Sequence, residues 1–570
     1  MKLIFIIILF MLFSTAEAQI VDNSLGVDTR VDYQSLKNFG PWDDRNYDLS
    51  LEDLTWLSTD EEQLREMVPA FYRVIFRKQF PQTPNTGSIQ YPRSLLNYFL
   101  LRYDGYLIDG KIYSDVQWDE SRRFYQVLME NATSAGSLIR QRVRALNSEV
   151  LVNSGAESAV SVSPINPNIV VAGVNSAGQE MLYSSDGGNS WTAAPDLTGN
   201  ECCDPAIDWK SDGSFVYNVT LGGNQVWFYR SDDNGQTWDS LNDETPGDNR
   251  REISGPTGSL NDKEYIHVDK SPTSPFQDNI YITWHQDNVI QFARSTDDGN
   301  TFSVVSFPQE PRGIGSDLVT DANGVIYHFW PSTQNSQIRM NKSTDGGLSF
   351  SPSVLVSPTL SSFIFPIPSM DTREVFIYNS VDIDSTGGTY NNRLYASWTD
   401  SVGAQTLNPL DNHARIQVAY SDDGGDSWTL TTPHETDDAL QVDRWHQWLK
   451  VDVNGIVHVA FYDTRQFANR EGVDMYHSYS SNGGQTWSTP DRLTTVSSPK
   501  STGFEFGDYN GMDFGSDANG MAIFSDNRAE GGANPDMDVY AAPISAIASV
   551  TNLIFSNGFE SDIIFANGFE

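Results

Sequence analysis

Cysteine is almost absent from this chain of 570 residues, which holds only two, Cys202 and Cys203, next to each other. A framework of several disulfides is therefore excluded, and so is a zinc site built on spaced Cys pairs. The eight His residues are scattered and no H-E-x-x-H motif occurs. The adjacent cysteines leave two interpretations open, a vicinal disulfide or a buried pair of thiols.

Basic residues are also scarce, because 36 Lys and Arg stand against 75 Asp and Glu, giving a net charge of −39. This charge excludes nucleic acid and anionic membranes as partners, since both repel an acidic surface. Aspartates in turns account for the excess. We therefore expect a monomer with no cofactor and no catalytic metal, although a structural Ca²⁺ ion is compatible with the composition.

Long apolar runs are missing beyond the first residues of the chain. The apolar run at residues 3–13 follows Lys2 and precedes Ala16, Glu17 and Ala18, which is the pattern of a secretory signal with a small-residue cleavage site. We predict that residues 1–18 are a signal peptide. The mature protein would then start near Gln19 and be soluble, with no insertion into a membrane, and would be secreted or held at the cell surface.

An eight-residue repeat, Ser-x-Asp-x-Gly-x-Ser/Thr-aromatic, is the most informative feature that the chain does contain. Its six copies, the last with Asn482 in place of Asp, are residues 184–191, 231–238, 295–302, 343–350, 421–428 and 480–487. The Asp can accept backbone N–H groups and the Gly supplies a positive φ, so each copy predicts a tight turn whose aromatic fills a gap. The repeat resembles the Asp box, or BNR repeat, of sialidase-like β-propellers. That resemblance implies a structural turn far from the active face.

From residue 149 onward, apolar and polar residues alternate with a period of two between Gly, Asn and Asp turns. The predicted fold class is therefore all-β, a seven-bladed β-propeller over residues 148–545. The first strands of its blades are expected near Ala159, Ala206, Tyr265, Asp317, Asn379, Trp448 and Met512. The seventh blade lacks a fourth strand, and we expect residues 149–152 to supply it and close the ring.

Two flanking regions have a different character. Residues 19–147 predict a small, mainly helical N-terminal domain with a hairpin at 106–113, which either packs on the propeller or forms a lid. Residues 546–570 form a tail with the sequence Asn-Gly-Phe-Glu at 557–560 and again at 567–570. The tail is interpreted either as an export or surface-retention tag or as a small appended hairpin.

Propeller geometry places the starts of first strands and the ends of second strands on the face opposite the repeats. Segments rich in acidic, basic and aromatic residues fall on that face, among them 202–205, 250–252, 262–265, 284–287, 443–448, 462–465, 505–510 and 526–528. Aromatic surfaces beside charged hydrogen-bonding groups suit a sugar site. The alternative is that these Trp residues and Asp–Arg pairs only hold the blades together.

From these segments we selected candidate site residues. The predicted catalytic residues are Tyr509, Asp508, His446, Asp463 and Glu264, and the predicted substrate-binding residues are Arg251, Arg444, Arg465, Arg528, Trp284, His285 and Trp445. The resemblance to sialidases implies an arginine triad drawn from these four arginines, with Tyr509 as nucleophile beside Glu505 or Glu264. Residues 159–167 contain no Arg, where the family has one in its first blade, so the sialidase mechanism is not transferred.

The predicted function is that of a secreted glycoside hydrolase acting on an extracellular glycan, which is the expected partner. Two alternatives stay open. One is a polysaccharide lyase for uronic-acid polymers, with His285, His446, Tyr509 and Arg444 in the site. The other is a propeller or adhesin that binds a glycan or protein without catalysis.

Overall fold

A computed structural model of the chain describes residues 106–108, 111–113, 149–176, 178–197, 201–223, 225–238, 251–253, 260–309, 311–501, 505–528 and 537–545. The chain divides into two units, Met1–Leu146 with Val550–Glu570, and Asn147–Ser549. In the first unit, β1 (Tyr106–Ile108) pairs antiparallel with β2 (Lys111–Tyr113), which confirms the predicted hairpin. The predicted signal peptide, the predicted helices and the tail lie outside the described residues.

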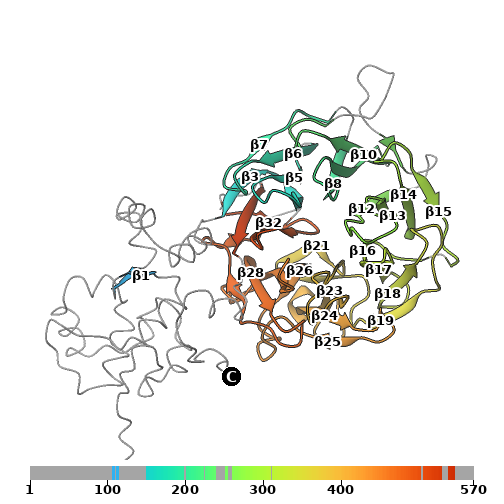
Figure 1. Ribbon diagram of the computed structural model, residues 1–570. Coiled ribbons are helices and arrows are strands. Elements are labelled where there is room, and N and C mark those ends of the chain that lie inside the picture. Colours follow the sequence, from blue (N-terminus) through green and yellow to red (C-terminus); the bar gives the residue numbers. More distant parts are fainter. Residues whose placement is uncertain are drawn as a thin grey trace, which may run out of the picture. The chain divides into compact units, whose positions relative to one another are not determined.

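The second unit is a seven-bladed β-propeller, as predicted, and its blades form a ring in Figure 1. The strands of each blade are antiparallel and run from the axis outward. Those of blades 1 and 2 are β4 (Ala156–Val162), β5 (Val170–Asn175), β6 (Gln179–Ser184) and β7 (Thr192–Ala193), then β8 (Glu201–Trp209), β9 (Val216–Gly222), β10 (Gln225–Ser231) and β11 (Arg251–Glu252). Those of blades 3 and 4 are β12 (Asn261–Val268), β13 (Ile280–Gln286), β14 (Val289–Ser295) and β15 (Ser303–Val305), then β16 (Asp317–Thr320), β17 (Ile326–Ser332), β18 (Gln337–Ser343) and β19 (Val354–Pro358).

The remaining blades follow the same order. Blade 5 consists of β22 (Asn379–Ile383), β23 (Leu394–Ser401), β24 (Ala414–Ser421) and β25 (Thr429–Thr431), with the 3₁₀ helix η3 (Pro409–Asp411) before β24. Blade 6 consists of β26 (Arg444–Val451), β27 (Val457–Asp463), β28 (Gly472–Ser480) and β29 (Asp491–Arg492), with β30 (Ser498–Pro499) also paired to β28. Every predicted first strand is therefore present at its predicted position.

Blade 7 closes the ring in the predicted way. Its inner strands are β31 (Gly511–Phe514), β32 (Gly520–Asp526) and β33 (Asp538–Ile544), and its outer strand is β3 (Val150–Ser154), from the start of the propeller. One sheet thus joins both ends of the unit. Between blades 4 and 5 the chain adds a hairpin that the blade pattern did not predict, β20 (Ile364–Ile367) and β21 (Met370–Phe376).

Burial explains why each strand takes its place in a blade. The second strands β9, β17, β23, β27 and β32 are buried along their whole length, and the sequence of each is mostly apolar and small residues. The third strands β10, β14 and β18 alternate buried and half-buried positions, as their period-two patterns require. The fourth strands β7, β15, β25 and β29 are short and largely exposed at the rim.

The six repeats form the turns after the third strands, on the face opposite the starts of the inner strands. In the second copy, the Gly235 N–H donates to Ser231 Oγ at 2.9 Å, and Thr237 donates its N–H and hydroxyl to the Asp233 carboxylate at 2.8 and 2.7 Å. Gly235 has φ of 81°, and a Cβ there would come within 2.6 Å of Val171 in blade 1. Each repeat is therefore a tight turn that seats on the preceding blade.

The repeat aromatics lie between blades, as expected. Phe302 packs on Phe228 of the preceding blade with ring centres 4.9 Å apart, and Phe350 packs on Phe292 at 4.8 Å. Edge-to-face geometry of this kind adds about 0.5–1.5 kcal/mol per pair beyond simple burial. The repeats thus stabilise the joints of the ring.

Aspartates in the inner strands provide a second set of joints. The carboxylates of Asp208, Asp317, Asp382 and Asp513 each accept a backbone N–H from the inner strand of the next blade, at 2.7 to 2.9 Å. Burial disfavours the charge of Lys450 on the axis, but these four carboxylates more than compensate and raise its pKa. Part of the acidic excess therefore has a structural role.

Candidate functional site

Four inner strands begin with a β-bulge that turns one side chain toward the axis. The bulged residues are Glu157, Asp204, Lys263 and His446, with φ of 49°, 57°, 48° and 49°. The strand register shifts at each of them. A left-handed conformation costs a non-glycine residue about 1–2 kcal/mol, and such strain collects where a site needs it. The bulges thus gather side chains from blades 1, 2, 3 and 6 at one mouth.

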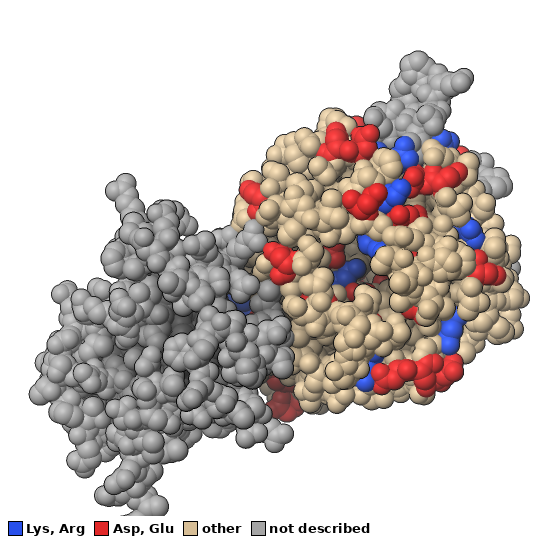
Figure 2. Space-filling model, viewed as in Figure 1, with Lys and Arg blue, Asp and Glu red and all other residues tan. Residues whose placement is uncertain are grey.

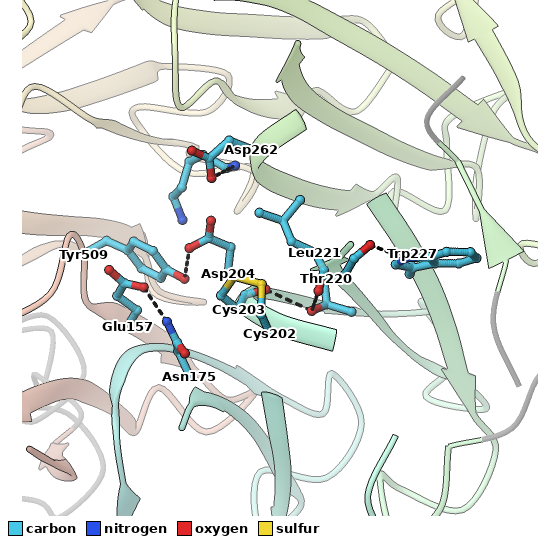
Figure 3. Close-up of a disulfide and its surroundings, with 12 residues drawn as sticks. Glu157, Asn175, Cys202, Cys203, Asp204, Thr220, Leu221, Trp227, Asp262 and Tyr509 are labelled. Atoms are coloured by element: carbon cyan, nitrogen blue, oxygen red, sulfur yellow. Dashed lines mark hydrogen bonds between the residues drawn. A yellow bond between two sulfur atoms is a disulfide. The ribbon is translucent and has the colours of Figure 1, made fainter. Parts of the chain in front are cut away.

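Asp204 lies at the centre of this cluster, between Tyr509 and Asp262 (Figure 3). The Tyr509 hydroxyl donates to Asp204 Oδ1 at 3.0 Å, and the Asp262 carboxyl group accepts the backbone N–H of Lys263 at 3.0 Å and lies close enough to Asp204 for its pKa to be affected. Lys263 places Nζ 3.1 Å from the centre of the Tyr509 ring. Asp204 and Tyr509 are 7% and 4% exposed, whereas Asp262 is half-buried and faces the opening.

Asp262 holds its proton more tightly than an ordinary aspartic acid. Burial raises the pKa of Asp262 to about 7, with the Asp204 carboxylate adding to the shift. Burial and Asp204 also raise the pKa of Tyr509 well above its usual range, so its hydroxyl stays protonated and donates. Asp262 therefore holds a proton up to near neutral pH beside a second carboxyl group, Asp204, and acid–base catalysis uses pairs of this kind.

Arg373 enters the mouth from β21. Its guanidinium binds the Asp508 carboxylate through Nε at 2.5 Å and Nη2 at 2.6 Å, and it contacts Glu157 at 3.3 Å. The Glu505 carboxylate fixes the hairpin by accepting the backbone N–H groups of residues 371–373, each at 3.1 Å. The hairpin that the blade pattern missed thus supplies the site with a cation.

Half-buried aromatic rings stand beside Arg373. Phe376 and Tyr378 stack with ring centres 5.1 Å apart, and Phe363 meets Phe376 edge-on at 5.7 Å. The two predicted aromatic platforms, Trp284 and Trp445, are instead buried, at 2% and 0% exposure. Trp284 donates its indole N–H to Asn261 at 3.0 Å, and Trp445 packs on Tyr462 and Phe506. They are core residues of their blades.

The mouth carries more acidic than basic groups. Its carboxyl groups are Glu157, Asp204, Asp262, Glu264 and Asp508, against the cations Lys263 and Arg373. Burial raises the pKa of Glu157 well above its usual range, and Asp508 and Asp204 contribute. The ring is hollowed at its centre, where basic and acidic atoms meet (Figure 2). Because the pKa values of Glu157, Asp262 and Glu264 are raised, the mouth presents carboxylic acids as well as carboxylates beside its two cations.

A narrow cavity of about 120 Å³ continues from the mouth along the axis, lined by inner strands of all seven blades. Glu264 lines it, and neither of its carboxyl oxygens has a hydrogen-bond partner among the described residues. Burial raises the pKa of Glu264 well above its usual range, and Asp204 adds to the shift. Glu264 therefore lies in the wall of this cavity with its protonated form favoured.

Several predicted site residues do meet at the mouth. Tyr509, Asp508 and Glu264 belong to the cluster described above, and His285 pairs across the strands with Asp262. Burial lowers the pKa of His446 to about 3, and Arg373 adds to the shift, so this imidazole is neutral. Neither ring nitrogen of His446 has a hydrogen-bond partner in the described part of the chain.

Other predicted residues form a separate ion-pair network in blade 6. Arg444 binds Asp463 at 2.7 Å and Asp438 at 2.6 Å, and Arg465 binds Asp463 at 2.7 Å and Glu435 at 3.2 Å. Arg444 is 1% exposed and Asp463 fully buried. We had placed Arg444, Arg465 and Asp463 in one site with Asp508 and Tyr509. Their contacts instead form a network within blade 6.

The last two arginines also lie away from the mouth cluster. Arg528 binds Glu149 and, at 2.6 Å, Asp526, and its guanidinium lies 4.1 Å from the centre of the Tyr540 ring. It therefore ties β32 to the segment that closes the ring. Arg251 lies on the outer strand of blade 2, opposite Phe228. The described residues thus contain no arginine triad at the mouth of the kind that the sialidase resemblance implied.

Sequence reasoning missed four important residues. Asp204, Asp262 and Lys263 lie in segments that the sequence analysis assigned to this face, so their position was predicted but their role was not. Arg373 lies in an insertion that follows no blade pattern. Among the described residues, no group of three or more His, Cys, Asp or Glu is arranged to hold a metal ion. The described residues also include no helix long and apolar enough to cross a membrane.

Comparison with known proteins gives limited similarity. Residues 32–117 match a family model described as a domain of unknown function (DUF8300). A xyloglucanase from Paenibacillus sp is 25% identical over 305 residues, which is 49% of this chain and 26% of the relative. The chain thus spans about a quarter of the length of that curated relative.

Solved structures share the propeller at low identity. A lectin, BP39L from Burkholderia pseudomallei, aligns with a TM-score of 0.42 and 10% identity over 69% of this chain and 100% of its own. An α-L-arabinofuranosidase from Fusarium graminearum, solved with an iminosugar inhibitor, aligns with a TM-score of 0.38 and 11% identity over 70% and 98%. These values carry no argument about activity.

Proposed function

We propose that the propeller is a glycoside hydrolase that cleaves a neutral glycan outside the cytoplasm. The observation that carries this proposal is the Tyr509–Asp204–Asp262 cluster, in which two carboxyl groups lie close together at the mouth and Asp262 has a raised pKa. Glycoside hydrolysis needs such a pair, one group to protonate the leaving oxygen and one to activate water or attack the sugar. The relative named as a xyloglucanase supports the choice of a glycan.

The residues take different roles in this proposal. Asp262 is the general acid, because it is the member of the pair that holds a proton near neutral pH and faces the opening. Asp204 is the base or nucleophile, and the Tyr509 hydroxyl orients it. The carboxyl groups of glycosidases stand about 5 to 9.5 Å apart. Asp262 must therefore move away from Asp204, which stays fixed against Tyr509, as the glycosidic oxygen enters.

Charge decides between a neutral and an anionic substrate. A lyase or sialidase must neutralise the carboxylate of its sugar, but the guanidinium of Arg373 is already held by both oxygens of Asp508. The other cation of the mouth, Lys263, lies over the ring of Tyr509. A neutral sugar needs no such cation, and the half-buried rings of Phe376 and Tyr378 offer it an apolar surface.

An assay of polymer cleavage tests the proposal. The wild-type protein is incubated with neutral polysaccharides, xyloglucan among them, and with a uronate polymer and a sialylated glycan as comparisons, and released reducing ends are measured. We expect cleavage of a neutral polymer and its loss in Asp262→Asn. Unsaturated products from the uronate polymer would favour the lyase. Tight binding without any product would favour the glycan-binding propeller.

The extracellular location belongs to the same proposal. The N-terminal apolar run and the Cys202–Cys203 disulfide support it, since disulfides persist mainly in oxidising compartments. Fractionation of cells that produce the full chain tests it. Recovery of shortened protein outside the cytoplasm is the expected result, and retention of the uncut chain inside would contradict it.

A further inference from the structure

The two cysteines that precede Asp204 form a disulfide. This settles the choice left open by the sequence in favour of the bonded pair. Cys202 is exposed at the mouth and Cys203 is half-buried, and Figure 3 shows the sulfur atoms beside Asp204. The bond closes a ring that contains a single peptide bond, so it restricts the backbone directly before the proposed base.

The strand around Asp204 has few other restraints. The register between β8 and β9 shifts between Glu201 and Cys203 and again between Cys203 and Ala206, so regular pairing is interrupted on both sides of Cys203. Asp204 also adopts the left-handed conformation, which a free chain disfavours by about 1–2 kcal/mol. Something other than the sheet must hold it there.

Restraints on the two sides of Asp204 supply that hold. Pro205 fixes its own φ and packs so closely on blade 1 that a Cβ on Gly173 would lie 2.5 Å from Pro205 Cβ. On the other side, the Thr220 hydroxyl donates to the Cys203 carbonyl at 2.9 Å, and the disulfide fixes Cys203 to Cys202. The equivalent bulges at Glu157, Lys263 and His446 have no disulfide.

We propose that the Cys202–Cys203 disulfide is a positioning element, a covalent clamp that holds the Asp204 carboxylate against Tyr509 and Asp262. The effect of the clamp on turnover rests on the proposed function, whereas the clamp itself is inferred from the geometry around Asp204. Reduction releases the clamp. A dithiol gives up two electrons and becomes a disulfide, the Sγ–Sγ bond breaks, and each sulfur takes up one proton. The acid–base pair is then formed only in oxidised protein.

The disulfide links adjacent residues, so the loop that it closes is too short to stabilise the fold much. A loss of activity without a loss of stability would therefore distinguish a positioning role from a structural one. Cross-links act mainly by shortening loops of the unfolded chain, and their effect grows with loop length. We therefore expect the double variant Cys202→Ala/Cys203→Ala to keep its melting temperature while turnover falls by about 10²-fold, the cost of misplacing a catalytic group by about 1 Å. Wild type treated with dithiol should behave in the same way and recover on reoxidation.

The titration of Asp262 reports the clamp without any substrate. The charged and titratable groups that face the Asp204–Asp262 pair are Tyr509, Asp508, Glu157, Lys263, Glu264, Tyr265, Tyr378 and His285. Release of Asp204 removes the nearest negative charge, so Asp262 should titrate at lower pH. Carbon-13 NMR of carboxyl-labelled aspartate measures this, with Asp262→Asn to assign the signal.

The outcomes separate the two proposals. If wild type cleaves no glycan, the proposed function fails, and the Asp262 titration alone decides the clamp. An unchanged titration in both the double variant and the reduced wild type would overturn the clamp, as would full turnover in either. A loss of turnover that only follows unfolding in both samples would show a structural disulfide and overturn the clamp as well.

Discussion

Two aspartates on opposite faces of the same ring show how burial and hydrogen bonding divide structure from chemistry. At the turn, Asp233 accepts hydrogen bonds from Ser231 and Thr237. Burial opposes its charge, but these bonds prevail and hold its pKa below the usual range. At the mouth, Asp262 accepts the backbone N–H of Lys263 at 3.0 Å, but burial and the nearby Asp204 raise its pKa to about 7. Asp233 therefore stays ionised in its turn, whereas Asp262 can gain or lose a proton near neutral pH.

This contrast explains why counting acidic residues was a poor guide to function. The chain has many more acidic than basic residues, but the carboxylates of the repeat aspartates and the inner-strand aspartates accept hydrogen bonds from backbone N–H groups. The mouth carboxyl groups instead face one another. The informative feature is therefore a carboxyl group whose surroundings raise its pKa, and the following changes test that distinction.

The largest effect is expected for Tyr509→Phe. Removing the hydroxyl that orients Asp204 should lower the turnover of a confirmed substrate by about 10²–10⁴-fold, the range of acid–base contributions, with binding nearly unchanged. Tyr217→Phe is the matched control, because Tyr217 also bonds to an aspartate, Asp298, at 3.3 Å, but on the turn side. Equal turnover in the two variants would remove Tyr509 from the proposed site.

The second change separates a structural arginine from a site arginine. Arg444→Met leaves Asp463 buried beside Arg465 alone and should lower the free energy of unfolding by about 3–5 kcal/mol, without changing the turnover of folded protein. Arg373→Met should instead lower both stability and turnover, because it leaves the buried carboxyl groups of Asp508 and Glu157 without their cation at the mouth. Denaturant unfolding and kinetics measure both. A large loss of turnover in folded Arg444→Met would show that the blade 6 network takes part in catalysis.

The third change compares pH dependence of stability. A raised carboxyl pKa means that the folded state binds the proton more tightly, so Asp262 lowers stability as pH rises from about 4, its unfolded value, through about 7. Asp262→Asn should therefore stabilise the propeller at pH 8 by about 1–2 kcal/mol after allowing for solvent screening, and hardly at all at pH 4. Asp233→Asn should show the opposite trend, losing its small effect at low pH. Parallel curves for the two variants would contradict the contrast.

The smallest effect concerns the turns. Asp233→Ala should cost about 1 kcal/mol, because it removes the acceptor for Thr237 and Ser231. Asp233→Asn should stay within about 0.5 kcal/mol of wild type. The sixth repeat shows why, since Asn482 accepts the Thr486 N–H at 2.9 Å and donates to its hydroxyl at 2.8 Å. A loss of turnover at unchanged melting temperature would mean that the turns act in the site.

The fold could be predicted from the sequence because its signals are local and repeated. Strand periodicity and the turn motif recur in each blade, so the position of every inner strand and the closing role of β3 followed from the pattern. The hairpin of β20 and β21 breaks the pattern, and it was missed for that reason. An insertion present once offers no second copy to compare.

The site was harder to predict, because bulges decide which side chain faces the axis. Nothing in the sequence shows that Glu157, Asp204 and Lys263 adopt a left-handed conformation, and in a regular strand their side chains would point to one or the other face of the blade. Residue type misled in the other direction. Arg444 and Trp445 are chemically suited to a sugar site, but their partners are Asp438, Asp463 and a hydrophobic core.

The most direct test of the central claim is the pH dependence of kcat/KM for a neutral glycan that the wild type cleaves. If Asp262 is the general acid, the rate must fall as that group ionises, with a midpoint near pH 7, and Asp262→Asn must lose both the activity and the alkaline limb. A rate that stays level from pH 5 to pH 9, or an Asp262→Asn variant that cleaves as fast as wild type, would contradict the claim.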